Sequence, residues 1–254
     1  MSNNKKWLMA DLKRGGSAPA FLTNKRKSMN LETKYAPSCL DQVIFPSEAV
    51  ERRVKGYATG KLEGHIIIHG PNGTGKTTIA NLIVKQLGGE YAQIEHNDHD
   101  ELLSKSDLKM YLLKAASFAA LTTSGKYFLI LNEFDNSKKN LSKFWAALDE
   151  CGDRAMAVIT TNHPMDIHPS IRSRCDAIEF PGVTAVKALS RIQVCLKAEG
   201  LILPDAQVLY YLKTKEQFMD LRKYFKVADE ILFLWNSNQK MPHWKAQELS
   251  LRVV

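Results

Sequence analysis

The run GPNGTGKT at residues 70–77 matches the G-x-x-x-x-G-K-[ST] pattern of a phosphate-binding loop. Glycines let backbone N–H groups point at phosphate oxygens without Cβ clashes, and a helix that starts after the loop offers its positive end. A glycine-rich turn before a helix is the plain structural alternative, but a strand before and a helix after favour nucleotide binding. The expected nucleotide-binding residues of this segment are Gly70, Pro71, Asn72, Gly73, Thr74, Gly75, Lys76, Thr77 and Thr78.

Two side chains of this loop carry specific chemistry. Lys76 is expected to reach the β- and γ-phosphates of a nucleotide, and the hydroxyl of Thr77 is expected to ligate magnesium.

A second motif, FLILNEFD, occupies residues 128–135. An apolar strand that ends in an acidic pair normally supplies an Asp that coordinates magnesium and a Glu that polarises the attacking water. Here Asn132 stands at the first acidic position, where it keeps an acceptor oxygen but loses the negative charge. Glu133 is therefore the candidate base, and Asn132 a weakened metal ligand. The alternative is that polar residues follow the strand only because the chain has reached solvent.

Three further polar residues stand at the ends of predicted elements, and their order along the chain carries the signal. Asn162 closes the strand that follows the acidic motif, where its amide is placed to orient an attacking water. Arg174 lies within Ser-Arg-Cys, after a segment opened by Pro169. Arg222 lies on the last predicted helix, from which it is expected to reach a γ-phosphate. A lone Asn or Arg is more often an ordinary surface residue.

Around these residues, short apolar runs alternate with segments of helical periodicity. Strands are expected at 65–69, 91–95, 127–131 and 155–160, and helices at 77–87, 107–121 and 141–149. Strands that alternate with helices predict a mostly parallel sheet with helices on both faces. After Pro181 and Gly182 only helices are expected, at 183–199, 205–213 and 216–235. The predicted fold is therefore α/β, followed by a small helical domain.

The predicted organisation is a basic leader (1–30), the α/β domain (31–182), the helical domain (183–236) and a short tail (237–254). Residues 1–30 carry seven Lys and Arg against a single Asp, whereas the whole chain has a net charge of +8. Such a leader is either a solvated flexible tail or an arm that binds nucleic acid, and charge alone favours neither.

Composition excludes several classes of protein. With 44% apolar and 24% charged residues in 254, the chain has the make-up of a soluble globular protein. No apolar stretch approaches the roughly 18 residues of a membrane span, and no signal peptide is evident. The four cysteines are far apart and form no C-x-x-C pair, which argues against a disulfide framework or a zinc site. Reduced thiols of this kind predict a cytoplasmic location.

The ordered set of motifs resembles the small ATPase subunit of sliding-clamp loaders, the replication factor C-like branch of the AAA+ ATPases. It is most similar to the versions carried by tailed bacteriophages. The resemblance covers roughly residues 31–235 and implies a P-loop AAA+ sheet followed by a helical lid domain. The motifs that carry it are KYAP at 34–37, GPNGTGKT at 70–77, ILNEFD at 130–135, TN at 161–162, SRC at 173–175 and LRK at 221–223.

The resemblance also implies roles for individual residues. Arg174 corresponds to an arginine finger that reaches the ATP of the neighbouring subunit, and so acts in trans. Asn162 and Arg222 correspond to the first and second sensors. The implied cofactors are ATP and Mg²⁺, with Thr77 and Asn132 as metal ligands. The catalytic set is then Lys76, Glu133, Asn162 and Arg174.

Taken as such a subunit, the chain would be an ATPase that helps to open a sliding clamp and load it onto primer–template DNA during DNA replication. Its expected partners are the clamp, other loader subunits in a ring or spiral, and the DNA, with no membrane. The expected location is the host-cell cytoplasm if the protein is viral. Two departures stand out: Ala36 occupies the place of a usual arginine, and Asn132 that of an aspartate. The 237–254 tail is too short for the family's collar domain.

The lysines around the second predicted helix and after the acidic motif are candidates for contact with a DNA backbone. A solvated helix face is the equal alternative for each of them. Two other functions also stay open: an ATP-binding assembly subunit that does not hydrolyse, and another AAA+ replication factor such as a helicase loader. The candidate DNA-binding residues are Lys105, Lys109, Lys138 and Lys139.

Overall fold

The computed structural model describes residues 30–89, 94–97, 107–117, 119, 122–134 and 141–237. The predicted leader and tail lie outside these residues, apart from Asn30 and Ser237. The centre of the fold is a five-stranded sheet in the order β2-β3-β4-β1-β5, with every neighbouring pair parallel. Its strands are β1 (His65–His69), β2 (Ile94–Asn97), β3 (Tyr127–Leu131), β4 (Ala155–Thr161) and β5 (Cys175–Glu179).

Alternating residues of the central strands pack against helices on the two faces of the sheet, as the period of two along a strand requires. On one face, Ile67 and Leu129 belong to a buried cluster with residues of α6 (Leu108–Ser117), α7 (Leu141–Cys151) and α8 (Pro169–Arg172). On the other face, Ile66 and Ile68 pack with α3 (Glu48–Ala58) and α4 (Lys76–Gly88). The predicted parallel sheet with helices on both faces is thus confirmed.

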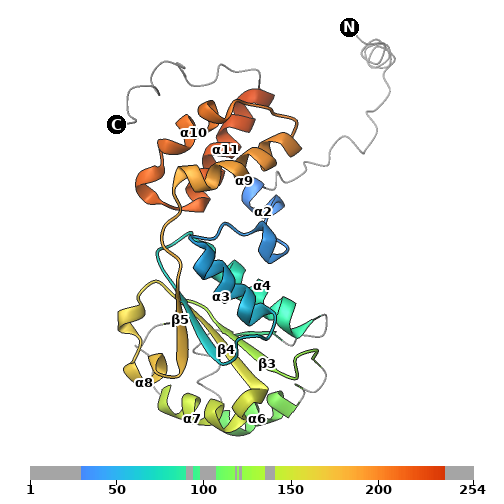
Figure 1. The fold of residues 1–254 in the computed structure, drawn as a ribbon, viewed down its shortest axis with the longest axis vertical. Helices are drawn as coiled ribbons and strands as arrows, with labels where there is room; N and C mark the ends of the chain where they lie inside the picture. Colours follow the sequence, from blue (N-terminus) through green and yellow to red (C-terminus); the bar gives the residue numbers. More distant parts are fainter. Residues whose placement is uncertain are drawn as a thin grey trace, which may run out of the picture.

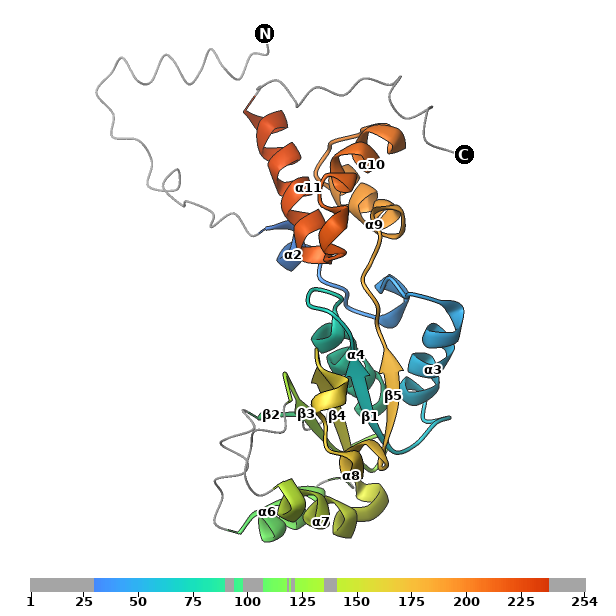
Figure 2. The same ribbon diagram turned by 90° about the vertical axis from the view of Figure 1, so that its left-hand side faces the viewer.

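The C-terminal helices form a separate apolar cluster of their own. It joins α9 (Ala185–Ala198), α10 (Asp205–Lys213) and α11 (Leu221–Asn236) with Leu31 of α2 (Leu31–Lys34). Figures 1 and 2 show this helical part at the opposite end of the molecule from α6 and α7. Short 3₁₀ turns lie at Leu40–Gln42, Gly152–Arg154, Pro164–Asp166 and Glu216–Phe218.

Several elements differ from the sequence-based expectation, among them the short helices α2 and α8, which were not predicted. Strand β5 was not predicted, because it lies at an edge of the sheet and, of its five residues, only Ile178 is fully buried. Helix α3 was also missed, since no helix or strand was predicted ahead of the strand at 65–69. The helix predicted at 216–235 is divided, because Met219 adopts a left-handed backbone (φ 47°) and α11 begins only at Leu221.

The other expected elements of the described chain are present, with ends that shift by a few residues. Strands β1 and β3 have the predicted bounds. Strand β2 (Ile94–Asn97) extends two residues past the predicted end at 95, and residues 91–93 of that prediction lie outside the described chain. Within the described residues, no helix combines the length and apolar character needed to cross a membrane.

Candidate nucleotide-binding site

The phosphate-binding loop connects the buried strand β1 to helix α4, as the sequence predicted. The loop needs glycine at its start, since a Cβ on Gly70 would lie 1.9 Å from the carbonyl oxygen of Phe180. At its end, Gly75 caps α4 in a left-handed conformation (φ 84°) and contributes no side-chain cap. The first turn of α4 also contains no acidic residue. The N–H groups and positive end of this helix are therefore kept for an anion.

Lys76 is held close to the loop. Its side chain is almost fully buried, and its Nζ donates hydrogen bonds to the carbonyl oxygens of Gly70 (2.9 Å) and Pro71 (2.7 Å). Burial and the nearby Arg222 lower the pKa of Lys76, while the carboxylates of Glu133 and Asp220 act in the opposite direction. The lysine is thus oriented before any ligand binds.

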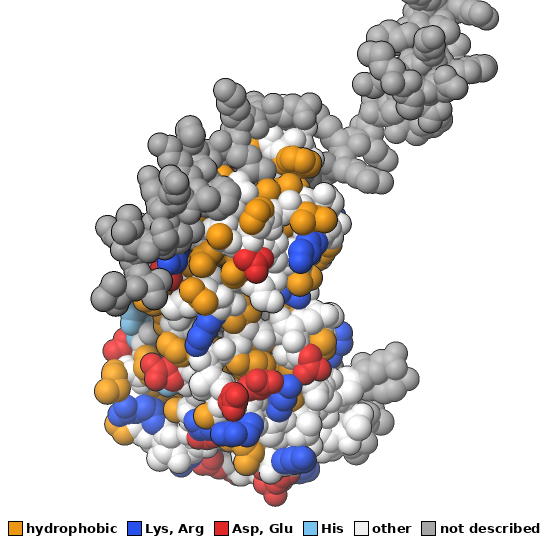
Figure 3. Space-filling view, turned by 45° about the horizontal axis from the view of Figure 1, so that its top comes forward, with side chains coloured by type: hydrophobic (Ala, Val, Ile, Leu, Met, Phe, Trp, Pro, Cys, Tyr) orange, Lys and Arg blue, Asp and Glu red, His pale blue; other side chains and the backbone are white. Residues whose placement is uncertain are grey.

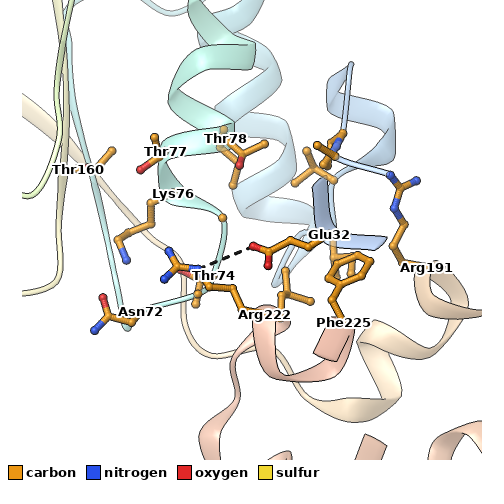
Figure 4. A pocket seen from close by; sticks show the side chains of 18 of the residues that line it. Glu32, Asn72, Thr74, Lys76, Thr77, Thr78, Thr160, Arg191, Arg222 and Phe225 are labelled. Atoms are coloured by element: carbon orange, nitrogen blue, oxygen red, sulfur yellow. Dashed lines mark ion pairs between the residues drawn. The ribbon is translucent and has the colours of Figure 1, made fainter. Parts of the chain in front are cut away.

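A cavity of about 370 Å³ opens beside the loop. The chain segment at residues 32–44 forms one wall, and the ends of β3 and β4 form another. Residues of α9 and α11 line the cavity from the helical part, so the space lies between the two parts of the chain (Figure 4). Ten predicted site residues line it: Asn72, Gly73, Thr74, Gly75, Lys76, Thr77, Thr78, Glu133, Asn162 and Arg222.

The ends of β3 and β4 place the predicted catalytic side chains. Glu133 also lines the cavity, and it adopts a left-handed backbone conformation (φ 50°) that is uncommon for a residue with a side chain. Its N–H donates to the hydroxyl oxygen of Thr160 (3.3 Å), and that hydroxyl donates to Oδ1 of Asn132 (3.2 Å). Together these bonds fix the turn that follows β3.

Asn132 belongs to this network rather than to the lining of the cavity, and its Oδ1 already accepts the bond from Thr160. Among the described residues, no group of three His, Cys, Asp or Glu side chains stands ready to hold a metal ion. The donor types fit magnesium held mainly by a nucleotide's phosphates, since Thr77 has a rotatable hydroxyl and Asn132 Oδ1 keeps one further lone pair.

The start of α11 is joined directly to the phosphate loop. The N–H of Leu221 donates to the carbonyl oxygen of Gly73 (3.1 Å), and Asp220 caps the helix by accepting from the N–H of Arg222 (2.8 Å). A Cβ on Gly73 would lie only 1.7 Å from Oδ1 of Asp220. Because of this close approach, the side chain of Arg222 enters the cavity near Lys76 (Figure 4). Its Nε lies 3.9 Å from Oε1 of Glu32.

Sequence reasoning missed several residues of the cavity. Glu32, Arg191 and Phe225 all line it, on α2, α9 and α11 respectively. Arg191 donates from Nη2 to the carbonyl oxygen of Tyr35 (2.6 Å), which holds the 32–37 segment against α9. The motif KYAP at 34–37 was the signal that this segment matters, but no local pattern connects it to residues more than 150 positions later.

Arg174 does not line this cavity. It directly precedes β5, whose first residue, Cys175, pairs with His65 at the start of β1, while the phosphate loop follows His69 at the other end. The rise along these strands separates their N-terminal ends from their C-terminal ends by roughly 13 Å. Arg174 instead pairs with Asp149 on α7.

The candidate DNA-binding lysines are only partly described. Lys105, Lys138 and Lys139 lie outside the described residues. Lys109 is exposed on α6 and pairs with Glu150 on α7 at 2.8 Å. On the face shown in Figure 3, positive and negative side chains are interspersed below the helical part, rather than separated into areas of one sign.

Comparison with known proteins finds similarity to ATPases over the segment that forms this site. A family model described as "ATPase family associated with various cellular activities (AAA)" matches residues 66–183. The chain is 29% identical over 224 residues to the sliding-clamp-loader large subunit of Escherichia phage RB69, a match that covers 83% of this chain and 67% of that protein. It is 27% identical over 197 residues to replication factor C small subunit 1 of Pyrobaculum arsenaticum, covering 75% and 58%.

The sliding-clamp-loader large subunit of Enterobacteria phage T4 is 28% identical over 216 residues, with 80% of this chain and 65% of that protein covered. The chain therefore spans about 58 to 67% of the length of these relatives. Among solved structures, the Thermotoga maritima RuvB Holliday junction branch migration motor matches with a TM-score of 0.61 at 17% identity, over 80% of this chain and 67% of that one. That likeness shows the fold alone. The expected resemblance to clamp-loader subunits of phages and to replication factor C is confirmed.

Proposed function

We propose that this chain hydrolyses ATP as a subunit of a sliding-clamp loader in DNA replication, because residues 66–183 match the model of the AAA family of ATPases. In this proposal the ATPase domain spans residues 31–182 and the lid spans 183–236. The observation that carries the proposal is the shared cavity, where the phosphate loop, Glu133, Asn162 and the lid residue Arg222 meet. The names of the relatives in two phages and an archaeon supply the assembly and the process.

Each cavity residue has a role in this proposal. The loop N–H groups and the ammonium of Lys76 bind the phosphates of ATP, and Arg222 adds a second positive charge from the lid. Glu133 accepts a proton from the water that attacks the γ-phosphorus, while Asn162 orients that water. The products are ADP and phosphate. Thr77 and Asn132 would hold magnesium together with the phosphates, and the ion would supply positive charge to the phosphate oxygens.

Arg174 completes the catalytic set from a neighbouring subunit in this proposal. Arg174 lies at the N-terminal ends of the strands, whereas the phosphate loop of the same chain lies at their C-terminal ends. This separation supports the assignment. A guanidinium at the N-terminal ends is out of reach of the cavity of its own chain but is open to a second molecule. The partners proposed are the other subunits of the loader, a sliding clamp and primer–template DNA.

Mixing two inactive variants tests the trans arrangement. A Lys76→Ala chain lacks a working phosphate site but offers Arg174, whereas an Arg174→Ala chain has the site but offers no arginine. The Arg174→Ala chain is first assayed as the only variant present, together with the proteins that co-purify with it in ATP. It should retain ATP binding, and its turnover should fall by roughly 10³-fold. Mixing both variants should restore part of the turnover, because some interfaces then pair an intact site with an intact arginine.

The control for this experiment is proof that both variants fold and enter the same assembly. If co-assembled variants recover no activity, the trans role is excluded. Recovery of a ring-shaped clamp among the co-purified proteins supports clamp loading, while recovery of a helicase in its place contradicts it.

One observation favours a second function, in which the chain binds ATP as a structural switch with negligible hydrolysis. Asn132 replaces a carboxylate, and its Oδ1 is engaged by Thr160. Under this alternative, turnover stays near background even with magnesium, primed DNA and the co-purified partners present, although ATP still binds.

A further inference from the structure

The side chain of Arg174 is held on its own subunit by two acceptors. Its Nε lies 3.2 Å from Oδ1 and 3.1 Å from Oδ2 of Asp149, near the C-terminal end of α7. Its Nη1 donates to the carbonyl oxygen of Ser170 at 2.8 Å. Two rigid elements, α7 and α8, thus determine the direction of one guanidinium.

The backbone of Arg174 is fixed without help from Asp149. The N–H of Arg174 donates to the carbonyl oxygen of Ile171 (3.0 Å), and the side chain of Ile171 is buried in the cluster beneath α6 and α7. Cys175, the next residue, is already part of β5 and packs against the same cluster. The backbone does not fix the direction of the long Arg174 side chain, which has many rotamers. Asp149 restricts that direction.

The pattern of donors suits presentation to a second molecule. A guanidinium has five N–H groups in one plane, and the contacts with Asp149 and Ser170 use Nε and Nη1. In the described part of the chain, Nη2 makes no hydrogen bond, and the side chain is 41% exposed. Nη2 is therefore available to an anion while Nε and Nη1 are held by the chain's own acceptors.

A neighbouring pair on the same helix shows what an ordinary surface pair looks like. Glu150 follows Asp149 in the chain and pairs with Lys109 at 2.8 Å. It contacts a flexible ammonium by one oxygen, and neither partner belongs to the catalytic set. Exposed pairs of this kind contribute little to stability. Asp149 differs because both of its oxygens approach one nitrogen of a residue in that set.

We propose that Asp149 is a positioning residue that orients Arg174 toward the ATP of the neighbouring subunit. This inference rests on the proposed trans role of Arg174. The carboxylate reduces the freedom of the guanidinium before assembly, so less order has to be gained when the transition state forms. It touches neither ATP nor the attacking water, and it acts only through the arginine.

The test is a double-mutant cycle on the full chain with the proteins that co-purify with it in ATP. Asp149→Ala should lower the kcat of the assembly by about tenfold and leave the KM for ATP within twofold, because ATP binding in its own cavity is untouched. Asp149→Glu should restore much of the loss, since a carboxylate returns. In the Arg174→Ala background, Asp149→Ala should have no further effect on the residual turnover.

Glu150→Ala is the matched control, and its turnover should equal that of the unaltered chain. Mixing adds a directional readout. Asp149→Ala mixed with Lys76→Ala should be active, because the first supplies the ATP site and the second an intact Arg174. Asp149→Ala mixed with Arg174→Ala should stay weak, since the only arginine available is poorly oriented.

The experiment distinguishes failure of the positioning role of Asp149 from failure of the trans role of Arg174. If Arg174→Ala abolishes turnover while Asp149→Ala does not lower kcat, or lowers it equally in the Arg174→Ala background, the positioning role is wrong and the proposed function stands. If Arg174→Ala leaves assembled turnover unchanged, the trans role itself fails, and the role of Asp149 fails with it.

Discussion

The contact between the phosphate loop and α11 makes a stability prediction for Gly73→Ala. Two costs follow from the structure. The first is conformational, since Gly73 has φ 73° and an alanine in this left-handed region costs about 1–2 kcal/mol. The second is steric, because the new Cβ would lie 1.7 Å from Oδ1 of Asp220, and that oxygen must move.

Moving Asp220 breaks the cap of α11, since the same Oδ1 accepts from the N–H of Arg222 at 2.8 Å. Loss of such a cap costs about 1 kcal/mol. The adjacent bond from Leu221 N–H to Gly73 O is also at risk, at about 1 kcal/mol. Gly73→Ala should therefore lower the free energy of unfolding by about 2–4 kcal/mol.

Gly75→Ala is the matched control, because Gly75 has a similar φ of 84° but a Cβ added there would meet no distant part of the described chain within 4 Å. It should cost only the conformational part, about 1–2 kcal/mol. The assay is urea unfolding of the full chain without nucleotide, followed by the fluorescence of the buried Trp145. In an Asp220→Ala background the clash is gone, so Gly73→Ala should then cost no more than Gly75→Ala. Equal costs for the two glycines in the unaltered background would refute the reasoning.

Two further predictions concern charge. Asn132→Asp keeps an acceptor for Thr160 and adds a carboxylate, so magnesium affinity should rise about tenfold and turnover should increase, measured by metal titration and ATPase assay; a fall in both would contradict the assigned role. His65 accepts from the N–H of Ala157 (3.0 Å), and its burial lowers its pKa below 6.5. Its contribution to stability is therefore present above about pH 6.5 and lost as the pH falls below that value, because the unfolded chain binds the proton more readily. His65→Asn should flatten this acid limb, measured by urea unfolding at pH 7 and at pH 5.

Local patterns in the sequence determined much of this protein. The eight residues of the phosphate loop can be recognised from their order alone. Glycine, lysine and threonine at that spacing are suited to bind phosphate, and all of them lie within one short segment. Strands β1 and β3 were predicted with their observed bounds, since a buried parallel strand is a short apolar run that needs no distant partner to be recognised. The alternation of such runs with helical segments was enough to predict the parallel sheet.

Only the tertiary structure decided which distant residues meet. Strand β5 escaped prediction because an edge strand with a single fully buried residue has little hydrophobic signal, and its partner β1 provides the pairing. Glu32 and Phe225 enter the cavity because α2 packs against the helical part, a contact between segments almost 200 residues apart. Likewise, the pairing of Asp149 with Arg174 depends on the end of α7 packing close to the residue that precedes β5. A sequence pattern indicates the conformation and burial that a segment prefers. Contacts between residues far apart in the chain depend instead on how the folded helices and strands pack against one another.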